Sequence, residues 1–361
     1  MAALSAESAA ITKEEVREYS EVSKGYTSFH NGDVLLAKIT PCFENGKIAQ
    51  ANLSREIGFG STEFHVLRPR IDRLDGRYLH HFLRQGAIRI AGEKRMTGSG
   101  GQRRVPESYL AELRIPLPPL PEQRRIAQIL DKAEALRAKR RAALAKLESL
   151  AQSIFLEMFG DLATNPWNFP IKQMIEIVDE KRPISYGILM PGEDQEGGVK
   201  YVRVVDIQNG SIDHSKVRRT TPEISNAFKR SLLKAGDLLM SIRGHVGRLA
   251  IVPKELNGAN ITQDSVRLAI VDAVPGYVCE YVRTPAIQYW MAKHVKGVAV
   301  KGINLGDLKV MPVMLPPLPL QQAFARRVEA IESLKAAQRA SLAKLDALFA
   351  SLQHRAFRGE L

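Results

Sequence analysis

The sequence predicts an α+β protein built as two copies of one unit, in which a mixed α/β domain is followed by a long helix. Two observations carry this prediction. Several motifs recur once, about 200 residues further along the chain, and a long amphipathic pattern follows each copy of one proline-rich motif. We expect the two long helices to pair as an antiparallel coiled coil. The length of 361 residues suits two domains of ordinary size.

The clearest repeat is a proline-rich segment found at Ile115–Pro121 and again at Val313–Pro319. Its offset of 198 residues also aligns Arg141–Glu148 with Arg339–Asp346, where six of eight positions are identical. The match extends beyond one motif, so the repeated unit includes the segment that follows it.

Weaker matches lie upstream of the proline-rich segments. His30–Ile39 resembles Lys234–Arg243 at an offset of 204 residues, and Tyr78–Ile88 resembles Tyr277–Ile287 at an offset of 199. Offsets that change slightly indicate small insertions in loops. A solenoid repeats every ~20–50 residues, so this period indicates a duplicated whole domain instead.

Each proline-rich motif is followed by a helical pattern, because apolar residues recur at spacings of three and four. The first helix, predicted over Glu122–Phe159, would be about 57 Å long at 1.5 Å per residue. Polar residues interrupt the apolar stripe at matching positions and suit a register-setting role. The predicted seam comprises Leu136, Arg140, Leu144, Leu147, Ile154, Leu334, Gln338, Leu342, Leu345 and Leu352. The alternative is that each helix packs only on its own globular domain.

The globular parts have mixed patterns. Short apolar runs, two of which follow Gly-Asp pairs, predict strands. The expected strands are Val34–Ile39, Lys47–Ala49, Phe64–Leu67, Tyr201–Ile207, Leu238–Ile242, Leu249–Val252 and Val266–Ile270. Amphipathic spacing predicts one helix over Tyr78–Ile90 and one over Tyr277–His294.

Composition limits the possible functions. A formal net charge of +13 favours a polyanionic partner, with nucleic acid first and an anionic membrane surface second. The two cysteines, Cys42 and Cys279, belong to no metal-binding or disulfide pattern. No apolar run approaches the ~20 residues of a membrane span, and the first residues lack the basic start of a signal peptide. We therefore expect a cytoplasmic protein without a membrane partner.

Glycine-rich basic loops lie at equivalent places in the two copies. Met96–Val105 corresponds to His294–Ile303, and Pro41–Lys47 and Ser241–Arg248 are two further loops of this kind. Glycine permits close backbone approach, and arginine or lysine neutralises phosphate or hydrogen-bonds guanine. An ordinary exposed turn is the alternative for any single loop. The candidate DNA-binding residues are Lys38, Lys47, Ser99, Gln102, Arg103, Arg104, Arg243, His245, Arg248, Lys296, Lys301 and Asn304.

These motifs, in this order and twice over, resemble the specificity subunit of type I restriction–modification enzymes. Leu117–Asp161 is similar to the central conserved region of that family, and Leu315–Leu361 is similar to its C-terminal one. Asn31–Ala49 and Ala235–Val252 are similar to parts of its target recognition domains. The resemblance covers essentially the whole chain.

The resemblance implies a division of the chain and a set of partners. Residues 1–116 and 161–314 would be target recognition domains, each reading half of a split site in double-stranded DNA, while 117–160 and 315–361 would form a helical ruler between them. Two methyltransferase (modification) subunits and restriction (motor-nuclease) subunits would be the protein partners. S-adenosylmethionine, ATP and Mg would bind to those partners, and this chain would bind no cofactor or metal.

The two copies differ at their beginnings. Most of Asn165–Ile207 has no counterpart in the first copy, because Met1–Leu4 aligns near Val204–Ile207. The comparison predicts that about 40 residues of the first domain are missing, through either a misassigned start or a true truncation.

Motifs that would support an enzyme are incomplete. Asn165-Pro166-Trp167 lacks the second proline of the amino-methyltransferase motif, and Thr97–Gly101 lacks the Gly-Lys-Ser/Thr ending of a phosphate-binding loop. We therefore predict no catalytic residue. Two other hypotheses stay open: a helical scaffold that does not read DNA, and a single-chain nuclease or methylase.

Overall fold

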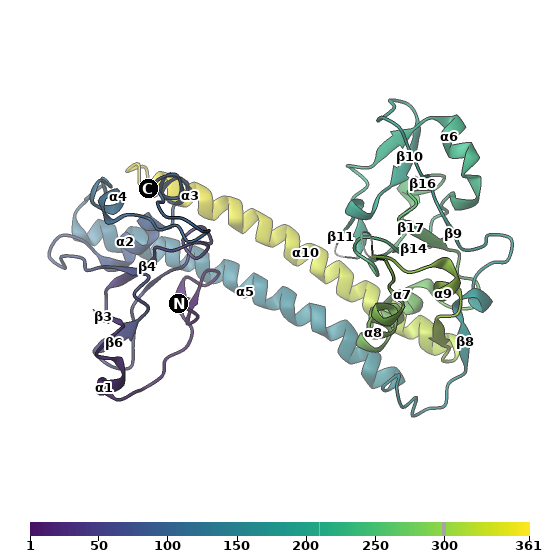
Figure 1. Cartoon of the computed structure of the whole chain (residues 1–361), viewed down its shortest axis with the longest axis horizontal. Coiled ribbons are helices and arrows are strands. Elements are labelled where there is room, and N and C mark those ends of the chain that lie inside the picture. Colours follow the sequence, from purple (N-terminus) through teal and green to yellow (C-terminus); the bar gives the residue numbers. More distant parts are fainter. Residues whose placement is uncertain (209, 298–300) are drawn as a thin grey trace. The chain divides into compact units, whose positions relative to one another are not determined.

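The computed structural model describes residues 1–208, 210–297 and 301–361 (Figure 1). Two compact units divide the chain. Unit 1 comprises Met1–Leu144 and Ala337–Leu361, and unit 2 comprises Ala145–Ala336. The boundary between the units falls within both long helices, so each unit contains one globular domain and part of each helix.

Unit 1 is organised around a three-stranded antiparallel sheet. Its central strand β4 (Val34–Ala37) pairs with β5 (Ile48–Gln50) on one side and β7 (Phe64–Leu67) on the other. All four residues of β4 are buried, as the unbroken apolar run predicts. The remaining strands of unit 1 form two antiparallel pairs, β1 (Leu4–Ser5) with β2 (Ala10–Ile11) and β3 (Thr27–His30) with β6 (Ile57–Gly60). A short helix, α1 (Tyr19–Val22), lies between β2 and β3 in the sequence.

The single helix predicted over Tyr78–Ile90 is wrong, because two helices occupy this region. Helix α2 (Gly76–Leu83) ends before Gln85, whose extended backbone separates it from α3 (Gly86–Lys94). Gln85 donates from Nε2 to the Phe82 carbonyl at 3.1 Å, which competes with continuation of the helix, and the glycine that follows is a weak helix former. A third helix, α4 (Glu107–Ala111), completes this part of unit 1.

The main sheet of unit 2 repeats the arrangement and adds a strand. Strand β14 (Leu238–Ser241) lies between β15 (Leu249–Ile251) and β17 (Ser265–Leu268), and β9 (Ser185–Tyr186) pairs with the outer edge of β17. Smaller groups surround it, namely β10 (Val199–Val202) between β13 (Arg218–Thr220) and β16 (Asn260–Ile261), β8 (Ile171–Gln173) with β18 (Pro312–Met314), and β11 (Ile207–Gln208) with β12 (Ser211–Ile212).

Two predictions for unit 2 need correction. The strand expected over Tyr201–Ile207 ends at Val202, because the Asp206 carboxylate accepts a hydrogen bond from the Arg203 backbone N–H at 2.9 Å and closes a short 3-10 turn, η2 (Val204–Asp206). The helix expected over Tyr277–His294 is broken into α7 (Pro275–Arg283) and α8 (Pro285–His294). Proline forces the residue before it out of the helical conformation, and Thr284 is extended accordingly.

The other helices of unit 2 are short. They are α6 (Pro222–Ala227), α9 (Leu305–Lys309) and the 3-10 turns η1 (Met174–Ile177), η3 (Lys229–Ser231) and η4 (Lys254–Leu256). Part of the basic loop predicted at His294–Ile303, residues 298–300, lies outside the described residues.

The two long helices are continuous over 40 residues in α5 (Leu120–Phe159) and 39 residues in α10 (Leu318–Ala356) (Figure 1). In unit 1 the beginning of α5, with Ile126 and Leu130, shares a core with the end of α10, with Phe349. In unit 2 the end of α5 contacts the beginning of α10, and the ring centroids of Phe155 and Phe324 lie 5.5 Å apart. The helices are therefore antiparallel in each unit, as predicted.

The residues of the predicted seam differ in their burial. Arg140 donates from Nη1 to the Gln338 Oε1 at 2.8 Å, so the two matching polar residues do meet. Leu136 and Leu334, however, are 50% and 53% exposed and do not belong to the seam. The buried and half-buried positions recur every seven residues, as at Leu130, Arg137, Leu144 and Ala151 in α5 and at Val328, Lys335, Leu342 and Phe349 in α10. Leu136 and Leu334 lie one residue before Arg137 and Lys335 and therefore face outward. The other seam leucines and Ile154 are half-buried.

None of the helices in the described parts of the chain is both long and apolar enough to cross a membrane.

Candidate nucleic-acid interface

A buried aspartate shapes the turn before the central strand in both units. The carboxylate of Asp33 accepts a hydrogen bond from the His30 N–H at 2.8 Å, and that of Asp237 accepts one from the Lys234 N–H at 2.7 Å. The glycine before each aspartate has a positive φ, +91° at Gly32 and +89° at Gly236, which closes the turn without strain. The same hydrogen-bonded turn therefore sets the direction in which β4 and β14 leave the turn in their own units.

The partner of that aspartate differs between the units. Arg68 forms two hydrogen bonds to Asp33, at 2.8 and 2.7 Å, from the end of β7. Asp237 is bound instead by Arg182, which belongs to the segment between β8 and β9 and donates at 2.8 Å. Burial alone would raise the pKa of Asp33, but hydrogen bonds from Arg68 and the His30 N–H outweigh it and hold that pKa below its ordinary value.

A buried glutamine ties each proline-rich motif to the helix that packs on it. Gln123 accepts from the Asp75 N–H at 2.9 Å and donates to the Arg73 and Pro118 carbonyls at 2.9 and 2.8 Å. Gln321 accepts from the Val274 N–H at 2.9 Å and donates to the Pro316 carbonyl at 2.7 Å. These paired residues were missed by the sequence reasoning, although their offset of 198 residues was a usable signal.

The described residues of the two predicted basic loops make the same antiparallel backbone pairing, a hairpin that in unit 2 is described over residues 294–297 and 301–303. Thr97 and Arg104 exchange backbone hydrogen bonds at 3.0 and 2.8 Å, and Lys296 and Gly302 do so at 2.8 and 2.9 Å. In unit 1 the hairpin pairs with the residues that directly follow the central strand, because the Val105 N–H donates to the Lys38 carbonyl at 2.9 Å.

The equivalent connection in unit 2 runs from the Ile303 N–H to the Ile242 carbonyl at 2.9 Å. A second main-chain hydrogen bond lies beside it in each unit. The Thr40 N–H donates to the Arg103 carbonyl at 2.9 Å, and the Gly244 N–H donates to the Lys301 carbonyl at 3.2 Å. The hairpin is thus built onto the end of the central strand in both units, and its basic residues extend from that strand's end.

The candidate residues of unit 1 come together at this place but differ in their contacts. Arg104 is bidentate to Glu63, at 2.9 and 2.7 Å, and Arg103 lies 3.8 Å from Glu44. Hydrogen bonding to Arg104 lowers the pKa of Glu63. Lys47 donates to a main-chain carbonyl, that of Met1, at 3.3 Å. Of the remaining candidates, Lys38 is half-buried, whereas Ser99 and Gln102 are exposed at the tip of the hairpin.

In unit 2 three of the candidates form hydrogen bonds or an ion pair through their side chains. Arg248 donates to the carbonyls of Val204 and Ile207, both at 3.3 Å, and Lys296 pairs with Asp307 at 2.9 Å. Arg243 makes a long hydrogen bond of 3.4 Å to the Gln263 amide. Arg243 and Lys296 are nevertheless exposed, as are His245, Lys301 and Asn304. Among the residues that the structure describes, neither Arg243 nor Lys301 forms an ion pair, so their charges face solvent.

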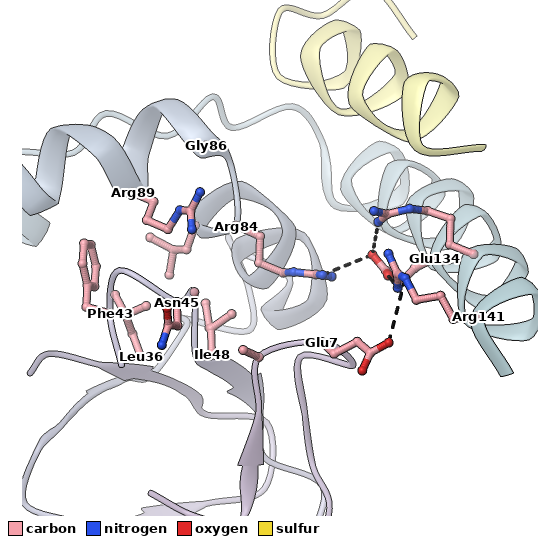
Figure 2. Close-up of a pocket in the computed structure, with 14 residues that line it drawn as sticks. Glu7, Leu36, Phe43, Asn45, Ile48, Arg84, Gly86, Arg89, Glu134 and Arg141 are labelled. Atoms are coloured by element: carbon pink, nitrogen blue, oxygen red, sulfur yellow. Dashed lines mark hydrogen bonds and ion pairs between the residues drawn. The ribbon is translucent and has the colours of Figure 1, made fainter. Parts of the chain in front are cut away.

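A buried ion-pair network in unit 1 was not foreseen from the sequence. The carboxylate of Glu134 on α5 is contacted by Arg84 at 3.2 Å, Arg137 at 3.0 Å and Arg141 at 3.6 Å, beside a pocket of about 440 Å³ (Figure 2). Arg137 also donates to Asp346 of α10 at 2.6 Å. Burial lowers the pKa of Arg84. The network therefore fastens α2, α5 and α10 to one another within unit 1.

In the part of the chain that the structure describes, no three His, Cys, Asp or Glu side chains are grouped so that they could hold a metal ion.

The duplicated unit, with a basic hairpin at the same place in each copy and a pair of long helices, defines a class of two-domain α+β proteins with two long helices. A family model described as the type I restriction modification DNA specificity domain matches residues 8–148 and 165–345. The chain belongs to this family of type I restriction–modification DNA specificity proteins.

Individual relatives agree with that membership. The specificity subunit of the type I restriction enzyme EcoBI from Escherichia coli is 30% identical over 321 residues, which cover 80% of this chain and 66% of that protein. The EcoAI specificity subunit from Escherichia coli is 48% identical over 113 residues, 31% of this chain and 19% of that protein. The chain thus spans less than two thirds of the length of these curated relatives.

A solved structure shares the fold. It shows a chain described in connection with complex assembly and conformational transition of the type I restriction–modification system. It matches with a TM-score of 0.56 at 20% sequence identity, and the match covers 100% of this chain and 90% of that chain.

Proposed function

We propose that this chain is the DNA sequence-specificity subunit of a type I restriction–modification complex and that each unit reads one half of a split site in double-stranded DNA. The observation that carries the proposal is the hairpin paired with the end of the central strand in both units, with Gln102 exposed at its tip in unit 1 and Lys301 exposed in unit 2. Exposed arginine, lysine and glutamine can reach phosphates and base edges, and the chain's charge of +13 supports an acidic partner.

Within this proposal, residues 1–116 and 161–314 are the two target recognition domains. The helical segments 117–160 and 315–361 set the spacing between half-sites and dock the methyltransferase subunits. Antiparallel packing of α5 and α10 in each unit supports the helical role.

The chemistry of the complex then belongs to its partners. Two methyltransferase subunits bring S-adenosylmethionine, and restriction subunits bring ATP and Mg for translocation and cleavage. This chain is proposed to be non-catalytic and to act with them on DNA in the cytoplasm. Membership of the specificity family supports this assignment.

Selection from a library tests the proposal directly. The full chain, assembled with the methyltransferase subunit of its own system, is incubated with duplexes containing a randomised window, and bound duplexes are sequenced at a fixed salt concentration. We expect two short preferred blocks separated by a constant gap. Binding that is equal for all sequences would instead support a scaffold that does not read DNA.

A turnover assay separates the proposal from an enzymatic one. The purified chain alone is incubated with duplex DNA and either Mg or S-adenosylmethionine, and cleavage and methyl incorporation are measured. We expect neither product until the partner subunits are added. Turnover by the chain alone would refute the non-catalytic assignment.

A further inference from the structure

Four arginines line the pocket of about 440 Å³ that lies beside Glu134 in unit 1 (Figure 2). They are Arg84 at the end of α2, Arg89 in α3, and Arg137 and Arg141 in α5. The acidic residues that line the pocket are Glu7 and Glu134. Asp346 of α10 adds a third carboxylate, 2.6 Å from Arg137 and 3.7 Å from Arg141. Positive charge is therefore in excess around this pocket.

Most N–H donors of these arginines are unused. Among the residues that the structure describes, the guanidinium groups of Arg84 and Arg141 make ion-pair contacts but no hydrogen bond. Arg84 lies 3.2 Å from Glu134, and Arg141 lies 3.6–3.9 Å from its three carboxylates. Nη1 of Arg84 is buried and has no partner, and Arg89 donates to the Glu44 carbonyl at 2.6 Å. Each guanidinium carries five donors, and a buried donor without an acceptor is unfavourable, so the pocket lacks acceptors.

The equivalent arginine of unit 2 is hydrogen-bonded. Arg283, at an offset of 199 residues from Arg84, donates to the Glu280 carboxylate on its own helix and to the Leu249 carbonyl at 3.1 Å. In α2 the position of Glu280 is occupied by His81, which has no carboxylate. The strands that unit 2 adds lie at the far edge of its sheet from β15, so they do not cause this difference. The unused donors of Arg84 are therefore a property of unit 1 and not of the shared fold.

The pocket has a charged end and a largely apolar end. Glu134 and Arg141 lie at one end, and Leu36, Phe43 and Asn45 lie at the other (Figure 2). The apolar side chains belong to the core of unit 1, so they form a fixed floor. The Asn45 side chain is exposed, and its amide can both donate and accept hydrogen bonds. The pocket volume lies within the range of about 300–1,000 Å³ that is usual for small-molecule sites.

We propose that this pocket of unit 1 binds a small organic phosphate with an aromatic body, the chemistry of a nucleoside monophosphate. The phosphate accepts hydrogen bonds from Arg84 and Arg141, because the planar donor fork of a guanidinium matches two phosphate oxygens. A phosphate brings up to two negative charges and three acceptor oxygens to the site, more than a carboxylate does. The aromatic body lies toward Phe43, where the Asn45 amide hydrogen-bonds its polar edge.

The recess of the pocket favours a small molecule over a phosphate of duplex DNA. The side chains of Arg84 and Arg137 are only 14% and 15% exposed. The phosphates of a duplex are fixed on the outside of a wide helix, so they contact side chains that project from a protein surface. Arg103, with a side chain that is 46% exposed, has that property. A small phosphate ester can enter where the duplex cannot.

Calorimetric titration of the full chain tests the proposal. The probes are the four common nucleoside 5′-monophosphates, the matching nucleosides and inorganic phosphate. We expect saturable binding of at least one monophosphate to one site per chain. Its nucleoside, which lacks the phosphate, and inorganic phosphate, which lacks the aromatic body, should each bind at least ~10-fold more weakly. The proposal is overturned if no monophosphate binds saturably up to about 5 mM, or if inorganic phosphate binds as tightly as the monophosphate.

Variants of the chain test which arginines bind the phosphate. Arg84→Lys keeps the charge but removes the donor fork, so monophosphate binding should weaken at least ~10-fold. Arg141→Lys should have the same effect and serves as the second variant if Arg84→Lys does not fold, as judged by circular dichroism. Arg95→Ala, at a side chain that is 60% exposed and paired with Glu112 outside the pocket, is the matched control and should bind within about twofold of the original. Unchanged binding in the folded lysine variants, or an equal loss in Arg95→Ala, overturns the site.

Hydrogen exchange and library selection separate this site from DNA reading. The monophosphate should slow exchange in α2 and in residues 43–48 but not in α7 of unit 2, and protection confined to unit 2 overturns the assignment. Arg84→Lys should leave the selected DNA blocks unchanged. If it weakens duplex binding as much as monophosphate binding, the pocket is a DNA contact and the small-molecule proposal fails. Loss of the selected blocks with intact monophosphate binding would count against the proposed function alone.

Discussion

The two units share a framework but stabilise it with different partners. Each has a buried aspartate in the turn before the central strand, a buried glutamine after the proline-rich motif and a hairpin on the end of the central strand. The charges around this framework differ. Glu134 in unit 1 is contacted by three arginines, whereas Glu332, at the equivalent position in unit 2, pairs with Lys335 at 2.7 Å.

This difference separates what the fold requires from what each unit does with it. Main-chain geometry is reproduced by the same side chains at the same offsets. Ion pairs are rebuilt locally, as when Arg68 in one unit and Arg182 in the other hold the equivalent aspartate. The surface charges on the hairpins differ between the units and are not set by the shared framework. Two domains need charges that can vary in this way if they are to read different half-sites.

The largest effect is expected from Glu134→Ala. Its removal leaves Arg84, Arg137 and Arg141 without their shared carboxylate, and breaking a buried charge network costs about 3–5 kcal/mol. Glu332→Ala, with one partner and a half-exposed side chain, should cost about 1 kcal/mol or less. The free energy of unfolding is measured by urea titration followed by circular dichroism.

Fluorescence supplies an internal control for that comparison. Both tryptophans, Trp167 and Trp290, belong to unit 2. Glu134→Ala should therefore shift the circular dichroism transition more than the fluorescence transition. Equal losses for Glu134→Ala and Glu332→Ala would contradict the distinction between the units.

Gln123→Leu should rank second. The substitution leaves the Asp75 N–H and the Arg73 and Pro118 carbonyls without their partner in a buried place, which costs about 3 kcal/mol in total. Gln321→Leu removes two such bonds and should cost about 2 kcal/mol. Differential scanning calorimetry of the two variants gives the order, and a larger loss for Gln321→Leu would disagree with it.

A pH dependence should be confined mainly to unit 1. His80 is 0% exposed, and burial holds its pKa well below the ordinary value. Folded His80 stays neutral while the unfolded chain takes up a proton below about pH 6.5, so its contribution to stability is present above that pH and is lost as the pH falls. The slope is at most about 1.4 kcal/mol per pH unit for one such group.

Urea titrations between pH 7 and pH 5 measure that slope. His80→Leu, which places an apolar side chain in the same buried position, should reduce it, and His214→Gln, at an exposed position in unit 2, should leave it unchanged. An unaltered slope in His80→Leu would show that another group is responsible.

The smallest effects are expected at the hairpins. Arg243→Ala and Lys301→Ala remove charges that face solvent, and each should weaken DNA binding by about 1 kcal/mol and flatten the salt dependence by about one unit. Lys296→Ala removes a charge already paired with Asp307 at 2.9 Å and should change the salt slope less. Anisotropy titrations over a range of salt concentrations distinguish solvent-facing from ion-paired basic residues. Identical salt slopes for the variants would mean that pairing does not decide whether a basic side chain can bind DNA.

Local patterns predicted much of this fold. The offset of 198 residues located both long helices, and apolar runs located β4, β7, β14 and β17. Periodicity could not locate the breaks at Gln85 and Thr284, because the apolar stripe continues across them. It also placed Leu136 in the seam, because the neighbouring position that the heptad line packs is occupied by a charged residue, Arg137, and apolar spacing selects the leucine instead.

The candidate site was predictable in position but not in detail. Glycine-rich basic segments identified the hairpins, because both signals are local in sequence. Whether a basic side chain is paired depends on residues far along the chain, as with Arg104 and Glu63 or Lys296 and Asp307. Contacts of that kind depend on tertiary packing, so they cannot be predicted from the spacing of residues in the sequence.

The central claim is that the helix pair fixes the distance between two DNA readers, and lengthening the pair tests it most directly. Duplicating Ala138–Leu144 in α5 and Ala336–Leu342 in α10 adds seven residues to each helix and keeps the seam in phase. The added length is about 10 Å, or about three base pairs. Library selection should return the same two sequence blocks with a gap longer by about three base pairs, and an unchanged gap would contradict the claim.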